Sequence, residues 1–349
     1  MPESTSAWVF RRKRFAAASA AIGSLLCVSP LPASADDGDS AIARYRKLWN
    51  PFSAGPELVS SADVQPSGQL FVRPYIYSEL AYAQYGNWSA STTPLNQKLI
   101  SIAPQVEMSV GILSWLEYEM YVPETSWWQL SGSATTARSS TGSGLGDITA
   151  FVKGRFHVQQ ADSWVPSLTE VLFMTFPTSD WFGPVGTSPI PGGFAPLGRL
   201  PSTHFGSPEL TDAILFRKNF QPFRVSGGVY YSYGLPSSKA GVSQDFGDIF
   251  QYRLAVERFL DDAQGFAFAL ELVGVHGLPF RLDGKPVDAG HTGFGLIGLQ
   301  PTIEYNFTDR VVGAAGVLFT AAGYNDVTAA YPNLSVYYYW NPRGKVVAR

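Results

Sequence analysis

Apolar and polar residues alternate with a period of two over many segments of this chain, from about Gln69 onward. In the segment 295–307, GLIGLQPTIEYNF, apolar residues on one parity alternate with Gln300, Thr302, Glu304 and Asn306. Successive side chains of a β-strand point to opposite faces, so this pattern predicts a strand with one apolar and one polar face. The pattern leaves open whether the apolar face meets a protein core or lipid.

Comparable segments recur along the chain, each of roughly ten residues, which is the length that a tilted strand needs to cross a bilayer. Clear examples are 104–110, 116–122, 147–156, 250–257 and 266–272. We expect about 12 strands, an even number, as single-chain barrels of the bacterial outer membrane require.

Short and long connections alternate between these segments. Short turns are expected at 112–114, 219–222, 261–264 and 308–310, with an intermediate connection at 157–166. Long polar or Gly/Pro/Ser-rich connections are expected at 84–97, 124–143, 177–207, 236–247, 277–291 and 321–332. Outer-membrane barrels have tight periplasmic turns and longer external loops, so the alternation predicts an all-β, antiparallel, up-and-down transmembrane barrel.

Composition bears on which face looks inward. Only 15% of the residues are charged, against about 25% in a typical soluble domain. The alternative fold is a secreted β-sandwich or lipocalin-like barrel, whose core would have to bury Glu257, Glu271 and Glu304 at several kcal/mol each unless they are paired. In a bilayer only helices and closed sheets satisfy every backbone polar group. We therefore expect the apolar parity to meet lipid and the polar parity to face a lumen.

Charged residues on the inward parity are candidates for lining a pore, because lumen side chains set selectivity in such barrels. The alternative is that they pair with one another inside a narrow, filled barrel, since about 12 strands leave a bore that side chains and a plug can largely occupy. The candidates are Glu107, Glu117, Glu119, Asp147, Lys153, Arg155, Arg253, Glu257, Glu271 and Glu304.

The N-terminus has the pattern of a secretory signal peptide, residues 1–35. A basic stretch, Arg11–Arg14, precedes an apolar run, Phe15–Val28, and Ala33–Ala35 supplies small residues for cleavage before Asp36. The alternative, a membrane anchor, needs a longer apolar run. The pattern predicts export, and with the barrel it predicts the outer membrane of a Gram-negative bacterium.

Residues 36–67 lack the alternating pattern. Asp39 or Ser40 is expected to cap a short helix with apolar residues from Ile42 to Trp49 along one side. This segment either folds into the lumen as a plug or lies in the periplasm. The barrel is expected over 68–340, followed by a periplasmic tail, 341–349.

Candidate chemistry is sparse. The only cysteine, Cys27, lies in the leader, so the mature chain has no thiol for disulfides or metal binding. Removing the leader takes away four cations and Glu3, a net +3, which moves the charge from −3 to near −6 and argues against nucleic-acid binding.

The histidines are the residues to test for catalysis. An outer-membrane phospholipase would carry His-x-Ser, whereas HTG at His291 has no serine and HFGS at His204 lies in a proline-rich loop. Spacing alone does not exclude an omptin-like Asp/His pair, and His157 and His276 complete the set of four. We expect solvated histidines, no enzyme, no cofactor and no metal.

Three segments resemble an outer-membrane barrel family, the MetA-pathway of phenol degradation family. They are GSGLGDITAFVKGRF at 142–156, WVPSLTEVLFMTFPTSD at 164–180 and LQPTIEYNFTDRVVGAAGV at 299–317. The resemblance spans most of the mature barrel. It implies an outer-membrane barrel, and some family members are linked to uptake of aromatic or hydrophobic compounds. The wider group includes exporters of functional amyloid subunits, whose long N-terminal helical extension is not matched by the short segment here.

These observations predict a passive channel or transporter, with small hydrophobic or aromatic compounds as solutes. Its expected partners are outer-membrane lipid, a small-molecule solute and, during biogenesis, the barrel-assembly machinery. One alternative is a secretion barrel for an exported polypeptide. The other is a structural or enzymatic barrel with a closed lumen.

Overall fold

The computed structural model divides into two compact units, 1–43 and 44–349. The described residues all belong to the second unit: 49, 51, 53–86, 89–131, 138–160, 163–178, 207–239, 242–245, 247–261, 265–279, 281–286 and 293–340. The predicted signal peptide, the start of the predicted helix, His204, His291 and the C-terminal tail lie outside these residues.

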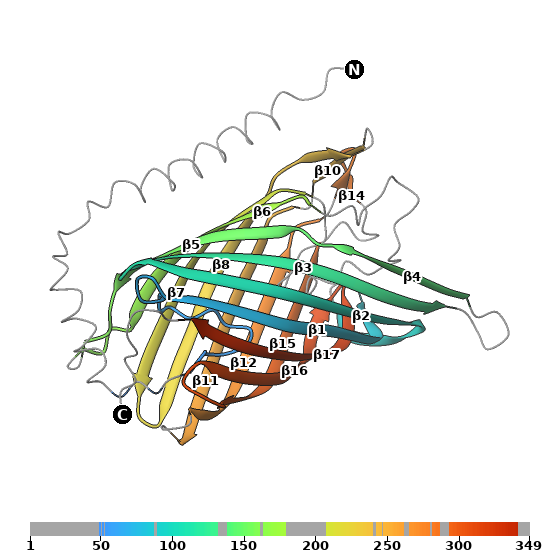
Figure 1. The fold of residues 1–349 in the computed structure, drawn as a ribbon. Coiled ribbons are helices and arrows are strands. Elements are labelled where there is room, and N and C mark those ends of the chain that lie inside the picture. The colour runs from blue at the N-terminus through green and yellow to red at the C-terminus, as the bar shows by residue number, and fades with distance from the viewer. Residues whose placement is uncertain are drawn as a thin grey trace. The chain divides into compact units, whose positions relative to one another are not determined.

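The second unit is a closed barrel of 12 antiparallel strands (Figure 1). Each strand pairs with its neighbours in the sequence, and β1–β17 pairing joins the first strand to the last. Both β4 and β5 pair with β3, so together they form one of the 12 positions, interrupted at Gly146 and Asp147. The strands are β1 (Leu70–Gly86), β2 (Ser89–Leu113), β3 (Leu116–Ser131), β4 (Arg138–Leu145), β5 (Ile148–His157), β6 (Ser167–Phe176), β7 (Glu209–Phe220), β8 (Phe223–Gly234), β11 (Ile249–Asp261), β12 (Phe266–Gly277), β15 (Phe294–Asn306), β16 (Val311–Tyr324) and β17 (Val327–Trp340).

Three of the four predicted short turns are confirmed and lie at one end of the barrel, which we call the turn end; residues 262–264 of the fourth lie outside the described residues. The β2–β3, β7–β8 and β15–β16 connections are there, together with the start of β1 and the end of β17. Outer-membrane barrels keep their tight turns on the periplasmic side and their long loops on the outer side. We call the opposite end of this barrel the loop end.

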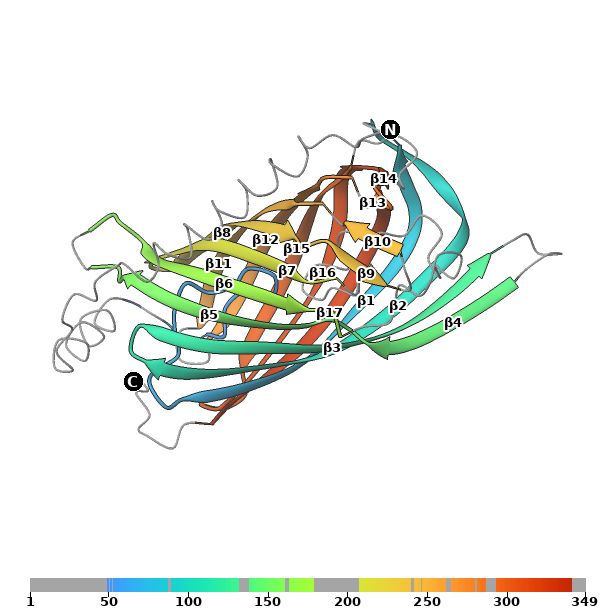
Figure 2. The same ribbon diagram turned by 90° about the horizontal axis from the view of Figure 1, so that it is seen from above.

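Several predicted long connections are wrong. Only two residues separate the end of β1 at Gly86 from the start of β2 at Ser89, and only Asn325 and Asp326 separate β16 from β17. The three strands β2, β3 and β4 continue past the ends of their neighbours, as Figures 1 and 2 show. Both faces of a strand can be polar once it has left the bilayer, so these extensions read as loops in the sequence.

Two further predicted loops contain short strands. The connections after β8 and β12 hold β9 (Ser237–Lys239), β10 (Val242–Asp245), β13 (Arg281–Leu282) and β14 (Lys285–Pro286), which pair into a separate four-stranded sheet. This sheet forms at the loop end, where the loops of an outer-membrane barrel are long.

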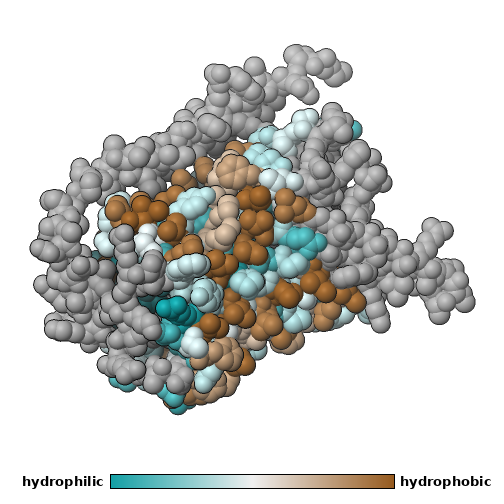
Figure 3. Space-filling model, viewed as in Figure 1, coloured by the Kyte–Doolittle hydropathy of each residue, from teal (hydrophilic) through white to brown (hydrophobic). Residues whose placement is uncertain are grey.

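The parity of the strands is as predicted. Along β15 the side chains of Gln300 and Thr302 are 0% and 3% exposed, whereas Ile303 and Tyr305 on the other parity are 49% and 40% exposed. Hydrophobic side chains cover much of the barrel wall that is visible in Figure 3. Among the described residues no helix has the length and apolar character needed to span a bilayer.

Candidate functional site: the plugged lumen

Residues 51 and 53–67, which we call the plug, lie inside the barrel (Figure 2). The side chains of Leu58 and Ala62 in this segment are 4% and 0% exposed. The sequence left a lumenal plug and a periplasmic segment as alternatives, and the structure places these residues in the lumen. Polar contacts in five places, from β1 around to β17, hold them there.

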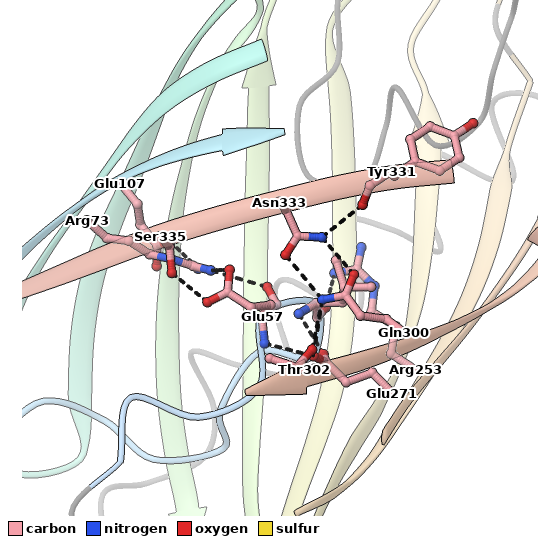
Figure 4. Close-up of polar contacts among 11 residues, drawn as sticks. Glu57, Arg73, Glu107, Arg253, Glu271, Gln300, Thr302, Tyr331, Asn333 and Ser335 are labelled. Atoms are coloured by element: carbon pink, nitrogen blue, oxygen red, sulfur yellow. Dashed lines mark hydrogen bonds and ion pairs between the residues drawn. The ribbon is translucent and has the colours of Figure 1, made fainter. Parts of the chain in front are cut away.

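Glu271 of β12 binds the backbone of the plug. Its two oxygens accept hydrogen bonds from the N–H groups of Glu57 at 3.1 Å and Leu58 at 2.7 Å. The Thr302 hydroxyl of β15 donates to the same carboxylate at 2.6 Å, and Arg253 of β11 donates to the Leu58 carbonyl at 2.8 Å. The wall therefore holds both the donor and the acceptor side of one stretch of extended chain (Figure 4).

Glu57 of the plug forms a buried ion-pair cluster with the first and last strands. One Arg73 nitrogen contacts Glu57 at 2.7 Å and the other contacts Glu107 of β2 at 2.9 Å. The Ser335 hydroxyl of β17 donates to the second oxygen of Glu57. The guanidinium also lies 4.5 Å from the centre of the Tyr337 ring, a cation–π contact. Figure 4 shows the Arg73 and Ser335 side chains directed at the Glu57 carboxylate.

The start of the plug lies beside β8, β11 and β15. Glu304 accepts hydrogen bonds from the Ala54 N–H at 2.8 Å and the Ser53 hydroxyl at 3.1 Å. Arg224 donates to the Pro51 carbonyl at 2.9 Å and pairs with Glu257 at 3.6 Å. Backbone groups of the plug thus form hydrogen bonds with the charged side chains of this part of the lumen, two of which also pair with each other.

The middle of the plug contacts the opposite wall. Asp63 pairs with Arg155 of β5 at 3.7 Å and with Arg217 of β7. The Thr169 hydroxyl of β6 donates to the Ala62 carbonyl. These contacts place the plug across the lumen, from the acidic side chains of β12 and β15 to the arginines of β5 and β7.

Glu117 of β3 holds the last part of the plug. It accepts a hydrogen bond from the Gln65 N–H at 2.8 Å and lies 3.5 Å from Lys153 of β5. Lys153 also pairs with Glu119 at 3.0 Å. Lys153 therefore pairs with both Glu117 and Glu119, and Glu117 also binds the plug backbone.

The ten lumen residues predicted from the sequence all lie on the buried or half-buried inner side of the barrel. The structure brings most of them to the plug or to a partner of the plug, and it buries Asp147 where β4 and β5 meet. Sequence reasoning missed Glu57, Asp63, Arg73, Arg217 and Arg224. Glu57 and Asp63 fall in a segment without alternation, whereas Arg73 has the inward parity of its strand and could have been found.

The inner wall becomes apolar toward the loop end. There β1, β11, β12, β15, β16 and β17 contribute the apolar lining, which packs against Leu58 of the plug. The lining consists of Tyr75, Tyr77, Ala81, Tyr85, Ile249, Val273, Val275, Leu296, Leu318, Val327, Ala329 and Tyr331. The sequence does carry a signal for it, because both parities are apolar in LVGV at 272–275 and in GLIGL at 295–299.

The described histidines do not form a catalytic arrangement. His157 ends β5, and His276 of β12 stacks between the rings of Tyr252 and Tyr324, with ring centres 6.0 and 6.3 Å away. Within the described part of the chain, no group of three His, Cys, Asp or Glu side chains could hold a metal ion.

A closed antiparallel barrel with an apolar outer face and an ionic interior defines the class of outer-membrane β-barrels. Among solved structures the chain is similar to the COG4313 outer membrane channel from Pseudomonas putida F1. Their TM-score is 0.62 at 13% identity, and the match covers 82% of this chain and 100% of that chain.

Other matches are more distant. The transport unit of the autotransporter AIDA-I from Escherichia coli has a TM-score of 0.43 at 10% identity, over 86% of this chain and 96% of that chain. The NanC porin has a TM-score of 0.42 at 9% identity, over 77% of this chain and 98% of that chain. No protein-family model and no curated protein matches the sequence. At these identities the likeness shows the fold.

Proposed function

We propose that this protein is a passive channel of the Gram-negative outer membrane for small hydrophobic or aromatic solutes, closed at its periplasmic end by the plug. The observation that carries the proposal is the change along the inner wall, which is ionic around the plug and apolar toward the loop end. A barrel that only anchors loops needs no apolar lining above an ionic plug.

The apolar lining supports the class of solute. Burial of apolar surface contributes about 25 cal/mol per Å², so a small aromatic molecule gains free energy when it leaves water for this part of the lumen. The sequence resemblance to the MetA-pathway of phenol degradation family, which no family model confirms, implies the same class of solute. The similar solved structure is described as an outer membrane channel, which supports the channel role.

The plug supports a gated mechanism. Hydrogen bonds and ion pairs, and no pairing into the barrel sheet, hold residues 53–65 against the wall. Water can replace such contacts when the plug moves, and the displaced plug leaves charged side chains to line an aqueous path. Solute then enters from the loop end, crosses the apolar lining and leaves at the turn end.

One observation favours the secretion barrel as a second candidate. Glu117, Glu271 and Glu304 bind backbone N–H groups of the plug, and any extended polypeptide offers the same groups. Such a lumen would hold an exported chain without regard to its side chains.

Uptake and conductance together test the proposal. We expect a strain that lacks the protein to take up small aromatic solutes more slowly than the parent strain and to take up sugars and amino acids at the same rate. We expect the purified protein to conduct in planar bilayers once the plug is removed. A barrel that stays closed without its plug contradicts the channel, and slower transport of a polypeptide instead of a solute favours the second candidate.

A further inference from the structure

Four buried polar atoms without a hydrogen-bond partner lie along the seam between β1 and β17, near the loop end. They are the hydroxyls of Tyr77, Thr328 and Tyr331 and the Oδ2 atom of Asp326. These side chains are only 2–7% exposed. Leaving a buried polar group unpaired costs about 1–3 kcal/mol, so these atoms indicate a partner that the described part of the chain does not supply.

The four atoms are spread along the seam, and those of Asp326 and Tyr331 lie toward its loop end. The β1–β17 register places Tyr77 opposite Asn333 and Ala83 opposite Thr328. Asp326 precedes β17, and its backbone oxygen accepts a hydrogen bond from the Tyr85 N–H at 2.7 Å. Glu79 of β1 acts electrostatically on both Asp326 and Tyr331, which places its carboxylate near both.

The Asp326 carboxylate is held in an unfavourable environment. Its Oδ1 atom accepts a hydrogen bond from the Val327 N–H at 2.7 Å, while Oδ2 has no hydrogen-bond partner. Burial raises the pKa of Asp326, and the neighbouring Glu79 carboxylate raises it further. A cation beside Oδ2 would relieve both effects, because it pairs with the ionised form and offsets the repulsion.

The surroundings indicate an organic cation. The rings of Tyr77, Tyr85 and Tyr331 belong to the apolar lining, together with Val327 and Ala329. Aromatic faces attract ammonium groups and apolar side chains bind the carbon body of a ligand. A calcium ion would need 6–8 oxygen ligands, as such ions usually take, and an apolar wall does not offer them. Figure 4 shows the Tyr331 ring directed away from the Glu271 and Gln300 network.

We propose that the β1–β17 seam is a binding site for a small organic amine, with the ammonium group at Asp326 and the Tyr331 hydroxyl and the carbon body against the tyrosine rings. The inference rests on the proposed function only in that a solute must reach the lumen. It narrows the solutes from apolar compounds in general to those that carry one positive charge.

Calorimetry on the full-length mature protein in detergent micelles tests the site. The probes are 2-phenylethylamine and its neutral counterpart 2-phenylethanol. We expect saturable binding of the amine, with an affinity at least tenfold higher than that of the alcohol. We expect Asp326→Asn to lower the affinity for the amine at least tenfold and to leave that for the alcohol unchanged.

The matched control is Asp248→Asn, an identical change in an aspartate near the loop end that accepts a hydrogen bond from Tyr231 instead of facing the seam. It should bind the amine like the wild type. Every variant is first checked for a folded barrel by its mobility on an unheated SDS gel. A second variant, Tyr331→Phe, removes one hydroxyl with little change in volume and should lower the affinity for the amine several-fold.

Three results would overturn the site: equal affinities for amine and alcohol, unchanged amine binding by folded Asp326→Asn, or calcium binding in place of amine binding. Because binding is measured without transport, the two proposals fail separately. If the protein conducts but does not bind the amine, only the proposed amine site is wrong. If it binds the amine but stays closed without its plug, only the proposed channel function is wrong.

Discussion

At the scale of single residues, Glu271 shows how this barrel uses a buried charge. Its carboxylate accepts hydrogen bonds from two successive N–H groups of the plug and from the Thr302 hydroxyl. Hydrogen bonds to a charged group contribute about 1.5–3 kcal/mol each. The residue therefore stabilises the closed position of the plug more than it stabilises the barrel.

Replacing Glu271 should loosen the plug. We expect Glu271→Ala to raise the fraction of time for which single channels conduct by at least tenfold, because two charge-assisted hydrogen bonds to the plug backbone are lost. Single-channel recording in planar bilayers measures this fraction. Glu170→Ala is the control, since Glu170 lies on the outward parity of β6. Equal open fractions in the two variants would show that Glu271 does not hold the plug.

Asp326 leads to a prediction about pH. Because burial raises its pKa in the folded protein, the folded state binds the proton more tightly than the unfolded state. Its cost to stability is therefore absent below the ordinary aspartate pKa of about 4 and grows as pH rises through the folded pKa. We expect Asp326→Asn to raise the free energy of unfolding at pH 8 and to leave it nearly unchanged at pH 4.

Denaturant unfolding of the two proteins in micelles, at both pH values, measures this difference. The amine is left out, because a bound cation would favour the ionised carboxylate. A stabilisation by Asp326→Asn that is the same at pH 4 and pH 8 would show that the ionisation of Asp326 does not affect folding.

At the scale of elements, the strands were predictable where lipid dictates the pattern and not elsewhere. The alternation in 295–307 predicted the two faces of β15, because one face meets hydrocarbon and the other meets polar groups. The extensions of β2 and β3 were read as loops, because outside the bilayer nothing requires an apolar face. The sequence did not decide between a lumenal plug and a periplasmic segment, since the order of the plug comes from contacts with distant strands and from no local periodicity.

The plug should be dispensable for the barrel. We expect a protein without residues 51–67 to fold and to conduct steadily, because the sheet pairing of all 12 positions excludes this segment except for one bridge at Ser67. Conductance in planar bilayers and mobility on unheated SDS gels measure the two outcomes. Failure of the shortened protein to form a barrel would show that the plug is part of the core.

The same shortened protein tests the lumen residues predicted from the sequence. Removing the plug takes away the Ser53 hydroxyl that contacts Glu257 and leaves the Arg224 pair to face the path. We expect Glu257→Lys in this background to shift the reversal potential in a salt gradient toward preference for anions. An unchanged reversal potential would place Glu257 away from the conducting path.

At the scale of the whole molecule, solvent determines which side chains lie where. The inner face carries the ion pairs of Arg73, Lys153 and Arg224, while the outer face carries Leu270, which is 55% exposed. The fold class, the inward parity and the candidate lumen charges followed from this inversion. The pairing of each charge did not, because parity gives the side of a strand and not the neighbour across the lumen.

A charge on the outer face should be costly only within the hydrocarbon. We expect Leu270→Arg, in the middle of β12, to make folding into bilayers less favourable by about 2–4 kcal/mol. Leu278→Arg, just beyond the same strand and similarly exposed at 50%, should cost about 0–1 kcal/mol. Folding into liposomes at graded urea concentrations measures both. Equal costs would mean that lipid does not cover Leu270.

The reach of the plug has a consequence for how the protein is made. Glu57 contacts Ser335, 278 positions later in the chain, and Ala54 contacts Glu304, 250 positions later. The ribosome synthesises the plug before the barrel strands. The residues that bind the plug come together only when β17 has paired with β1. If the barrel is a channel, as proposed, we expect each newly inserted molecule to be open before it closes, and the rate at which the plug binds the lumen to set how long solutes leak through it.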